Sequence, residues 1–233
     1  MNPDPRSLDI HRLPLVALAD EVCFPRTEVR LQIVEPAYCD LLDALWRRDG
    51  AEGRIGLVLS LEAGDLVADA LEGVAIDAGT SARLIAVDRQ ADGCSVVLEG
   101  ERRFRVEREV DGGRWREAWV RPLLEPEVSE LDPDVQSMRR ELIVRTSRLA
   151  VELGERFALD SEQLRLLASD LSFEAMVNHL AANMDMAPIK KLQLLRTALP
   201  DRALSLLTIL QGRQHILDLL RPYRHLADHP ELS

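Results

Sequence analysis

The spacing of apolar residues changes near residue 126, and this change constrains the fold more than any other feature of the 233-residue chain. Before it, apolar and polar residues alternate, as at Val29, Leu31 and Ile33. After it, apolar residues recur every three, four or seven positions. Alternation places side chains on one face of a strand, whereas the longer spacing places them on one face of a helix. We therefore predict an α+β chain, β-rich first and helical second.

Six alternating runs and one helical segment make up the first half. The runs lie at residues 29–33, 55–61, 73–88, 94–99, 102–110 and 115–124. The helical segment 36–48 starts with Pro36, which suits a first turn, and is followed by Gly50, which can end a helix. Asp92-Gly93 lies between two runs, where a hairpin turn needs residues that tolerate positive φ. Residues 1–126 are predicted to form a β-rich domain with one inserted helix.

Four or five helices are predicted after Pro126. The first is long and amphipathic, and Gly154 can close it. Asp160 and Gln163 have the spacing of a capping box for the next helix. The acidic, proline-containing segment 125–134 marks the boundary, so residues 127–233 are predicted to form a separate helical domain. Further helix starts are expected at Ser172, Pro188 and Pro200.

The charge distribution argues against several classes of partner. The chain has 29 basic and 40 acidic residues and a net charge of −11, which repels a polyphosphate, so no nucleic acid is expected. Residues 1–126 carry 16 basic and 24 acidic residues, a net charge of −8. A preference for basic segments of a bound polypeptide is therefore expected in this half.

The same composition predicts a cytoplasmic protein. Charged residues interrupt every apolar run well before the roughly 20 residues that a membrane span needs. The first residues lack the basic start and apolar stretch of a secretory signal. The three cysteines, Cys23, Cys39 and Cys94, form no CxxC pair and are expected to be buried, reduced thiols rather than zinc ligands or disulfides.

Short motifs in residues 11–200 resemble the N-terminal domain of ATP-dependent Lon proteases and of its stand-alone bacterial relatives. Phe24-Pro25 resembles the start of the family's FPG motif, and Glu35-Pro36 with Tyr38 resembles its EPRY motif. The sequence departs from the family where Arg26 stands in place of the usual glycine and Ala37 in place of the usual arginine. Further matches are Leu13-Pro14-Leu15, Gly56-Leu57-Val58-Leu59, the run from Ala78 to Leu84 and the run from Val97 to Val106.

The resemblance implies a small β-barrel-like, PUA-like domain wrapped on one helix, followed by a helical bundle. It also implies a role in recognising polypeptides for proteolysis, as part of protein quality control. A complete Lon protease has an ATPase module and a Ser-Lys proteolytic domain after this region. The given sequence reaches Ser233 without a GxxxxGK[ST] loop, and we expect a member that lacks both modules.

No catalytic constellation emerges from the sequence. Its two lysines, Lys190 and Lys191, lie on a predicted amphipathic helix where solvated lysines are ordinary, although a buried lysine beside a serine would act as a base. None of the five histidines has the spacing of a metal motif; His225 and His229, four residues apart, form the one weak pair. His179 is interpreted as a packed side chain. We predict no enzyme activity, cofactor or metal.

Two sequence elements are candidates for peptide binding, each with a structural alternative. Phe24 and Pro25 could form a recognition loop or could close one end of the β domain. Met176, Met184 and Met186 could form an adaptable apolar surface, or could pack against the first long helix. A cleft between the two predicted domains is the expected binding place, because ligands often bind at domain junctions.

The run Arg102-Arg103-Phe104-Arg105 could bind phosphate. Glu99, Glu101, Glu107 and Glu109 flank the run and are expected to neutralise it, so a ladder of ion pairs across strands is the favoured interpretation.

The leading hypothesis is a non-catalytic module that binds unfolded or apolar polypeptide segments. The alternative is an adaptor or assembly factor with one fixed protein partner. A small-molecule hydrolase that uses His179 ranks last. The sequence predicts no membrane partner and does not define the oligomeric state.

Overall fold

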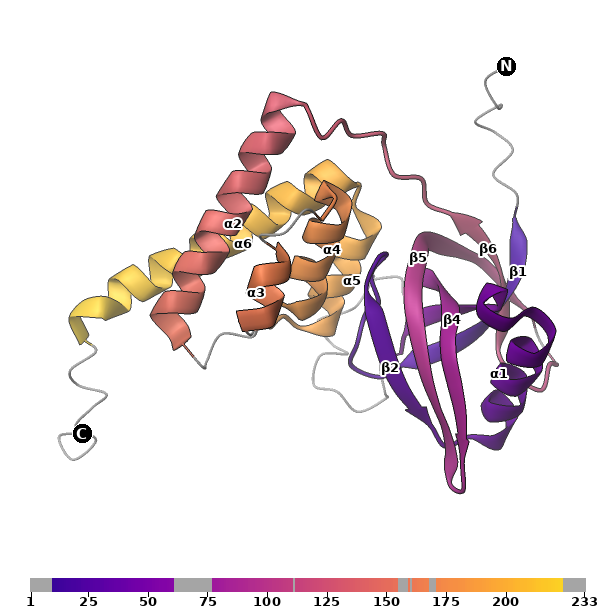
Figure 1. Ribbon diagram of the computed structural model, residues 1–233. Helices are drawn as coiled ribbons and strands as arrows, with labels where there is room; N and C mark the ends of the chain where they lie inside the picture. The colour runs from indigo at the N-terminus through magenta and orange to yellow at the C-terminus, as the bar shows by residue number, and fades with distance from the viewer. Residues whose placement is uncertain are drawn as a thin grey trace, which may run out of the picture. The chain divides into compact units, whose positions relative to one another are not determined.

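The computed structural model describes residues 10–60, 77–110, 112–154, 159, 161–167 and 171–223 (Figure 1). The chain forms two compact units, and each is described by itself. The first unit combines residues 1–126 with residues 178–198, and the second combines residues 127–177 with residues 199–233. Residues 178–198 thus pack with the β-rich part of the chain. The division into domains at residue 126 stays a prediction, because compactness does not test independent folding.

The first unit is built on a six-stranded sheet whose order is β2-β5-β4-β3-β1-β6, with an additional pairing of β5 with β6. This additional pairing closes the strand order on itself, so five of the strands form a ring. The mixed α+β architecture, with six strands, one helix and a helical C-terminal part, confirms the predicted fold class. The strands are β1 (His11–Leu18), β2 (Glu28–Ile33), β3 (Arg54–Leu59), β4 (Ala78–Gln90), β5 (Gly93–Val110) and β6 (Glu117–Pro122).

One strand pair departs from the expected antiparallel hairpins. β1 pairs with β3 in parallel, whereas the other five strand pairs are antiparallel. Parallel neighbours need a long connection, usually with a helix. Here that connection contains β2 and helix α1 (Pro36–Asp49). The inserted helix is therefore part of the long connection that lets β1 and β3 lie parallel in the ring.

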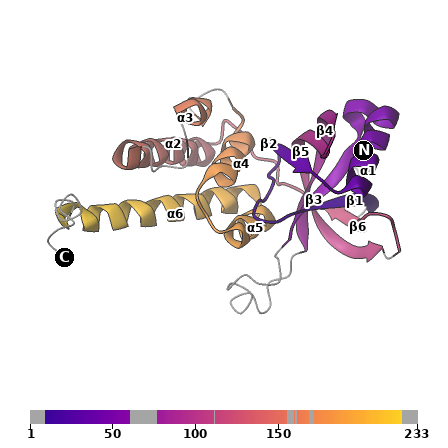
Figure 2. The ribbon, with the colours of Figure 1, turned by 90° about the horizontal axis from the view of Figure 1, so that it is seen from below.

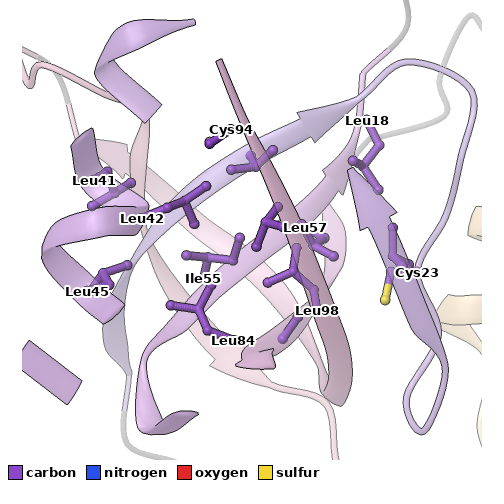
Figure 3. Close-up of a cluster of buried hydrophobic side chains, with 14 of the residues drawn as sticks. Leu18, Cys23, Leu41, Leu42, Leu45, Ile55, Leu57, Leu84, Cys94 and Leu98 are labelled. Atoms are coloured by element: carbon purple, nitrogen blue, oxygen red, sulfur yellow. The ribbon is translucent and has the colours of Figure 1, made fainter. Parts of the chain in front are cut away.

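Helix α1 covers one side of the ring and contributes to its core. Pro36 starts the helix, and Gly50 ends it with a φ of 55°, as the sequence predicts. A short 3-10 turn, Gly50–Glu52, follows. Leu41, Leu42 and Leu45 point from α1 toward Ile55, Leu57, Leu84 and Leu98 of the strands (Figure 3). The core is thus aliphatic, and its burial provides most of the driving force for folding this unit.

The hairpin of β4 and β5 is longer than the sequence predicts. The predicted strands 94–99 and 102–110 are one continuous strand, β5. Its register with β4 shifts at Ser81/Ala82, where Ser81 pairs with Arg102 and Ala82 pairs with Gly100. Glu101 is therefore an extra residue in a bulge. A bulge interrupts the alternation of side chains, which explains why periodicity divides one strand into two runs.

The helices after Pro126 begin and end near the expected signals. Asp132 caps α2 by accepting a hydrogen bond from the Asp134 amide at 2.8 Å, and Gly154 ends it. Ser172 accepts a bond from the Ala175 amide at 3.2 Å and caps α4, whereas Asp160 lies outside the described residues. The helices are α2 (Pro133–Leu153), α3 (Ser161–Leu167), α4 (Phe173–Asn183), α5 (Pro188–Arg196) and α6 (Leu199–Leu220), with a 3-10 turn at Arg221–Tyr223.

Within the second unit, α2 and α6 pack against each other (Figure 2). Their buried side chains recur at helical spacing, as at Leu142 and Leu149 on α2 and at Leu206 and Leu210 on α6. The Arg145 guanidinium, on α2, donates to Gln214 Oε1, on α6, at 2.9 Å. Apolar packing and this polar contact together hold the two helices side by side.

All three cysteines are buried free thiols. Burial raises the pKa of Cys23 to about 12 and the pKa of Cys94 to about 12, so both thiols stay protonated near neutral pH. Among the described residues, no helix is both long enough and apolar enough to cross a membrane.

Candidate functional site

A concavity of about 460 Å³ opens on the first unit, over strands β3, β4 and β5. Its volume is in the range of ordinary ligand sites, which is about 300 to 1,000 Å³. Five arginines and two glutamates dominate its lining, so the local balance is positive although the chain is acidic. We call it the arginine-lined concavity. Its lining residues are His11, Arg26, Arg54, Ser81, Arg83, Glu99, Gly100, Glu101, Arg102, Arg103, Phe104 and Pro122.

A tight turn, Phe24 to Thr27, brings Arg26 to the edge of the concavity. The Thr27 amide donates to the Phe24 carbonyl at 3.3 Å, which closes the turn. Pro25 occupies the second position, and Arg26 occupies the third with a φ of 65°. A type II turn has this pattern and favours glycine at its third position, because a side chain there is strained. Arg26 is the one residue other than glycine with positive φ among those described.

Strand β5 holds this turn in place. The Arg26 amide donates to the Gly100 carbonyl at 2.8 Å, and the Gly100 amide donates to the Thr27 carbonyl at 2.9 Å. A Cβ atom at Gly100 would lie 2.2 Å from the Phe24 carbonyl oxygen, so the close approach requires glycine. The Thr80 hydroxyl adds a bond of 2.6 Å to the Cys23 carbonyl. These hydrogen bonds hold the turn in one conformation, and such support is what allows a strained residue to persist.

Glutamates of β5 pair with arginines of neighbouring segments. Arg54 Nε lies 2.7 Å from Glu101 Oε2, and Arg83 pairs with Glu99. The hydrogen bond from Arg54 to Glu101 raises the pKa of Arg54 above its ordinary value. Glu107 pairs with Arg121 at 2.7 Å, and Glu109 pairs with Arg116, which directly precedes β6. These pairs confirm the predicted ladder of ion pairs across strands.

The ladder does not neutralise the run of arginines at residues 102–105, which corrects the sequence interpretation. The four glutamates bind arginines outside the run, and the register of β4 with β5 places one of these arginines, Arg83, directly opposite Glu99. Within the run, Arg105 lies 3.3 Å from Asp77 Oδ2. Arg102 is exposed, and no described residue forms an ion pair with it. Local composition therefore does not report which charges are paired.

Arg103 forms the floor of the concavity and is 3% exposed. Its Nε lies 2.7 Å from Glu125 Oε1. Its Nη1 donates to the carbonyls of Leu195 and Thr197, both at 2.7 Å. Leu195 lies in α5 and Thr197 directly follows it, so the buried guanidinium attaches the end of this helix to the sheet within the first unit.

Arg26 and Arg102 form the rim of the concavity. Both side chains are exposed, and no described residue forms an ion pair with either of them. Arg54, Arg83 and Arg103, by contrast, all have carboxylate partners. The rim thus offers two guanidinium groups that are not engaged in ion pairs with the described residues. Guanidinium groups bind carboxylates and phosphates through paired hydrogen bonds.

The residues predicted to bind peptide occupy different environments. Phe24, Pro25, Met176 and Met184 are buried, whereas Met186 is half-buried. Burial favours the packing alternative for the first four, since a ligand cannot reach them without a rearrangement. Their role in binding stays a prediction, and Met186 is the member of the set that a ligand can contact directly.

Of the three groups weighed as bases, Lys190 is exposed, whereas His179 and Lys191 are partly buried. Burial lowers the pKa of His179 below its ordinary value, while a backbone hydrogen bond with Arg26 and the charge of Glu28 oppose this shift. Lys191 Nζ donates to the Ala182 carbonyl at 2.6 Å, near the end of α4, and burial lowers the pKa of Lys191. Lys191 is therefore half-buried rather than fully solvated, and its ammonium group caps a carbonyl in the last turn of α4.

The described residues contain no group of three or more His, Cys, Asp or Glu side chains arranged to hold a metal ion. His225 and His229 lie outside the described residues.

A second candidate surface lies on the second unit, near the end of α6. Four apolar side chains recur at positions i, i+3, i+4 and i+7, and each is more than half exposed. We call them the apolar stripe, and they are Ile216, Leu219, Leu220 and Tyr223. Gln214, two residues before the stripe, is buried. On a helix of 3.6 residues per turn, the first three share one face of α6, and Tyr223 lies in the 3-10 turn that follows.

Arg26 and Arg102 attract notice in the sequence, but nothing there assigns them to one site. Arg26 stands out as a departure from a glycine position after Phe24-Pro25, and a turn with positive φ at Arg26 explains why glycine is usual there. Nothing in the sequence around Arg54 or Arg83 indicates that either residue lines a binding site. Only the pairing of β3 with β4, which places Arg54 opposite Arg83, brings them to the same place.

Comparison with known proteins identifies a sequence family. The family described as the ATP-dependent protease La (LON) substrate-binding domain matches residues 12–211, which is most of the chain. A search of curated proteins gives no match.

Two solved structures have a similar fold. The N-terminal domain of a Lon protease from the Mycobacterium avium complex has a TM-score of 0.64 at 17% identity, and the alignment covers 86% of this chain and 98% of that one. A Lon N-terminal domain protein from Xanthomonas campestris has a TM-score of 0.59 at 24% identity, with 85% of this chain and 98% of that one covered.

Proposed function

Because the chain belongs to the family of ATP-dependent protease La (LON) substrate-binding domains, we propose that it is a non-catalytic module that recognises polypeptides. The observation that carries this proposal is the family match across residues 12–211, which includes every lining residue of the arginine-lined concavity except His11 and ends before the apolar stripe. The proposed place of action is the cytoplasm, and the proposed context is protein quality control.

Two kinds of contact support binding to a polypeptide. The arginine-lined concavity offers guanidinium donors to carbonyl or carboxylate groups of an extended chain. The apolar stripe offers aliphatic and aromatic surface to apolar segments. Contiguous apolar surface on a protein often marks an interaction site, because its removal from water is favourable. Together these surfaces suit unfolded segments, which expose both backbone and apolar side chains.

Binding to an unfolded polypeptide tests the proposal. The probe is a fluorescein-labelled polypeptide kept unfolded by alkylation of its cysteines, and the readout is fluorescence anisotropy with the full chain. We expect saturable binding that is weaker for the same polypeptide in its folded, disulfide-bonded form. No saturable binding across several unfolded polypeptides would contradict the proposal.

A matched pair of variants locates the apolar contact. Leu219→Ser removes part of the apolar stripe, whereas Leu204→Ser removes a similarly exposed leucine that lies elsewhere on α6. We expect Leu219→Ser to weaken binding several-fold and Leu204→Ser to leave it unchanged. Met186→Ser tests the accessible member of the predicted methionine set in the same assay.

The alternative function is an adaptor with one fixed partner. Purification of the tagged chain from its native cells distinguishes the two. A single stoichiometric partner favours the adaptor, whereas many unrelated proteins favour a receptor for unfolded segments.

A further inference from the structure

The conformation of Arg26 is the first observation that points to a specific ligand. A side chain at a φ of 65° is strained, because its Cβ atom lies too close to the backbone. The same turn would form without strain if glycine stood there, because glycine adopts positive φ freely. Strained residues cluster where function requires them. Here the strain places a guanidinium group at the edge of the arginine-lined concavity.

The bulge in β5 is the second observation. Glu101 is the extra residue opposite Ser81 and Ala82, and residues 99–104 of β5 all line the concavity, so the bulge lies within the lining. Bulges are common next to functional sites, where they change the direction of side chains. Arg102 directly follows the bulged residue and is the second available guanidinium group of the rim.

The chemistry of the lining favours carboxylates of a peptide over the phosphates of a nucleic acid. Arg54 and Arg83 are paired with Glu101 and Glu99, which leaves Arg26 and Arg102 as the available cations. Two cations are enough to bind a few carboxylates. A nucleic acid, by contrast, is bound by a row of basic residues along its phosphates and by aromatic side chains that stack on its bases. Phe104, the aromatic residue of the lining, is 1% exposed.

We propose that the rim of the arginine-lined concavity binds the carboxylates of acidic peptide segments, with Arg26 and Arg102 as the contacting residues. This proposal rests on the proposed function and names the substrate class. It also reverses the expectation from the net charge of residues 1–126, which favoured basic segments. The reversal arises because Glu99 and Glu101, the two acidic residues of the lining, are engaged in ion pairs, whereas the two rim arginines form none with described residues.

The test compares three unfolded peptides that share length and apolar residues. One carries Asp and Glu, the second carries Asn and Gln at the same positions, and the third carries Lys and Arg. Anisotropy with the full chain at low salt is expected to show binding of the acidic peptide roughly five- to tenfold tighter than the amide peptide, in line with a few partly exposed ion pairs. The basic peptide is expected to bind most weakly.

Variants assign this preference to the rim. Arg26→Gly and Arg102→Ala are each expected to remove most of the preference for the acidic peptide. Arg108→Ala is the matched control, because Arg108 is an exposed residue of β5 without an ion pair among the described residues and lies outside the lining. It is expected to leave the preference unchanged. Arg26→Gly is also expected to raise the melting temperature by about 2 to 4 °C, because it relieves the strain.

The outcomes separate this proposal from the proposed function. Equal binding of the acidic and amide peptides overturns the inference and leaves polypeptide recognition standing. Absence of binding by all three peptides overturns both. An Arg26→Gly variant that is more stable yet keeps the acidic preference overturns the role of Arg26. Tighter binding of a single-stranded RNA oligomer than of the acidic peptide overturns the assignment to peptides.

Discussion

Arg102 and Arg103 are neighbours in one strand, yet they differ in burial and in their ion pairs. Arg103 is 3% exposed, and its guanidinium forms an ion pair with Glu125 and donates hydrogen bonds to two carbonyl groups near the end of α5. Arg102 is exposed and has no ion pair among the described residues. A guanidinium whose donors meet fixed acceptors stabilises the fold, whereas one left to solvent stays available to a ligand. The same type of side chain, arginine, thus stabilises the fold at the floor of the concavity and stays available to a ligand at its rim.

The contrast between floor and rim also explains why regional charge is a poor guide to binding. Residues 1–126 have a net charge of −8, yet the arginine-lined concavity has five arginines and two glutamates. Charges on exposed groups are screened by salt and contribute little at a distance. The charge that a ligand meets is the local balance of unpaired groups, which depends on the register of the strands.

We expect the largest loss of stability from a substitution at the floor of the concavity. Arg103→Ala removes a buried cation, leaves Glu125 and the carbonyls of Leu195 and Thr197 without its donors, and opens a cavity. Breaking a buried ion pair in this way costs about 3 to 5 kcal/mol in the free energy of unfolding. Urea denaturation of the full chain measures it. Hydrogen exchange should also become faster in α5.

Arg102→Ala is the control for this prediction. It changes the adjacent residue in the same strand, and we expect a change within about 0.5 kcal/mol, as for an ordinary surface position. Similar losses of stability in the two variants would show that the floor and the rim do not differ as proposed.

The second effect concerns the turn that carries Arg26. Gly100→Ala places a Cβ atom 2.2 Å from the Phe24 carbonyl oxygen, so the backbone must shift. We expect a loss of about 1 to 3 kcal/mol in the free energy of unfolding, as for overpacking, and a weaker preference for acidic peptides because Arg26 moves with its turn.

Gly212→Ala is the matched control for this substitution. Gly212 lies in α6 with open space around it, and alanine is the better helix former by about 0.8 to 1 kcal/mol. We therefore expect greater stability and unchanged peptide preference. Chemical denaturation measures the stability, and the three-peptide assay measures the preference. A neutral Gly100→Ala would show that the turn adapts without cost.

Much of the fold could be predicted from the sequence, because local patterns encode it. Alternation identified the segments of five of the six strands but missed β1, and Pro36 with Gly50 defined α1. The parallel pairing of β1 with β3 and the continuity of β5 could not be found in this way. Periodicity reports which face of a segment is apolar, but it does not report which segment lies beside it or where a bulge interrupts it.

The candidate site was predicted less well than the fold. The predicted peptide-binding set was chosen by residue type, and burial depends on packing between distant segments, which residue type does not determine. Phe24 and Met184 are both nearly inaccessible for this reason. Arg26 is recognisable as unusual, yet its meaning depends on its φ and on its bond to Gly100. A local motif can therefore indicate a turn, but only the strands around it determine what the turn presents.

The smallest effect on stability comes from freeing a paired arginine of the lining. Glu101→Gln removes the charge opposite Arg54 with little change in the shape of the side chain, and Arg54 keeps a longer contact of 3.4 Å with Glu52. Because Arg54 is 44% exposed, the lost ion pair should cost less than about 1 kcal/mol. Loss of the closer carboxylate partner of Arg54 should tighten binding of the acidic peptide about two- to fivefold, with no gain for the amide peptide.

Glu107→Gln provides the comparison that isolates the concavity. Glu107 pairs with Arg121 at the same distance of 2.7 Å, with similar exposure, and neither residue lines the concavity. Both variants change the net charge of the chain by one unit, so a general electrostatic effect would tighten acidic-peptide binding equally in the two. We expect the gain in Glu101→Gln alone, since Arg54 lines the concavity and Arg121 does not. Equal gains would place the preference in the overall charge and remove the distinction between paired and available arginines of the lining.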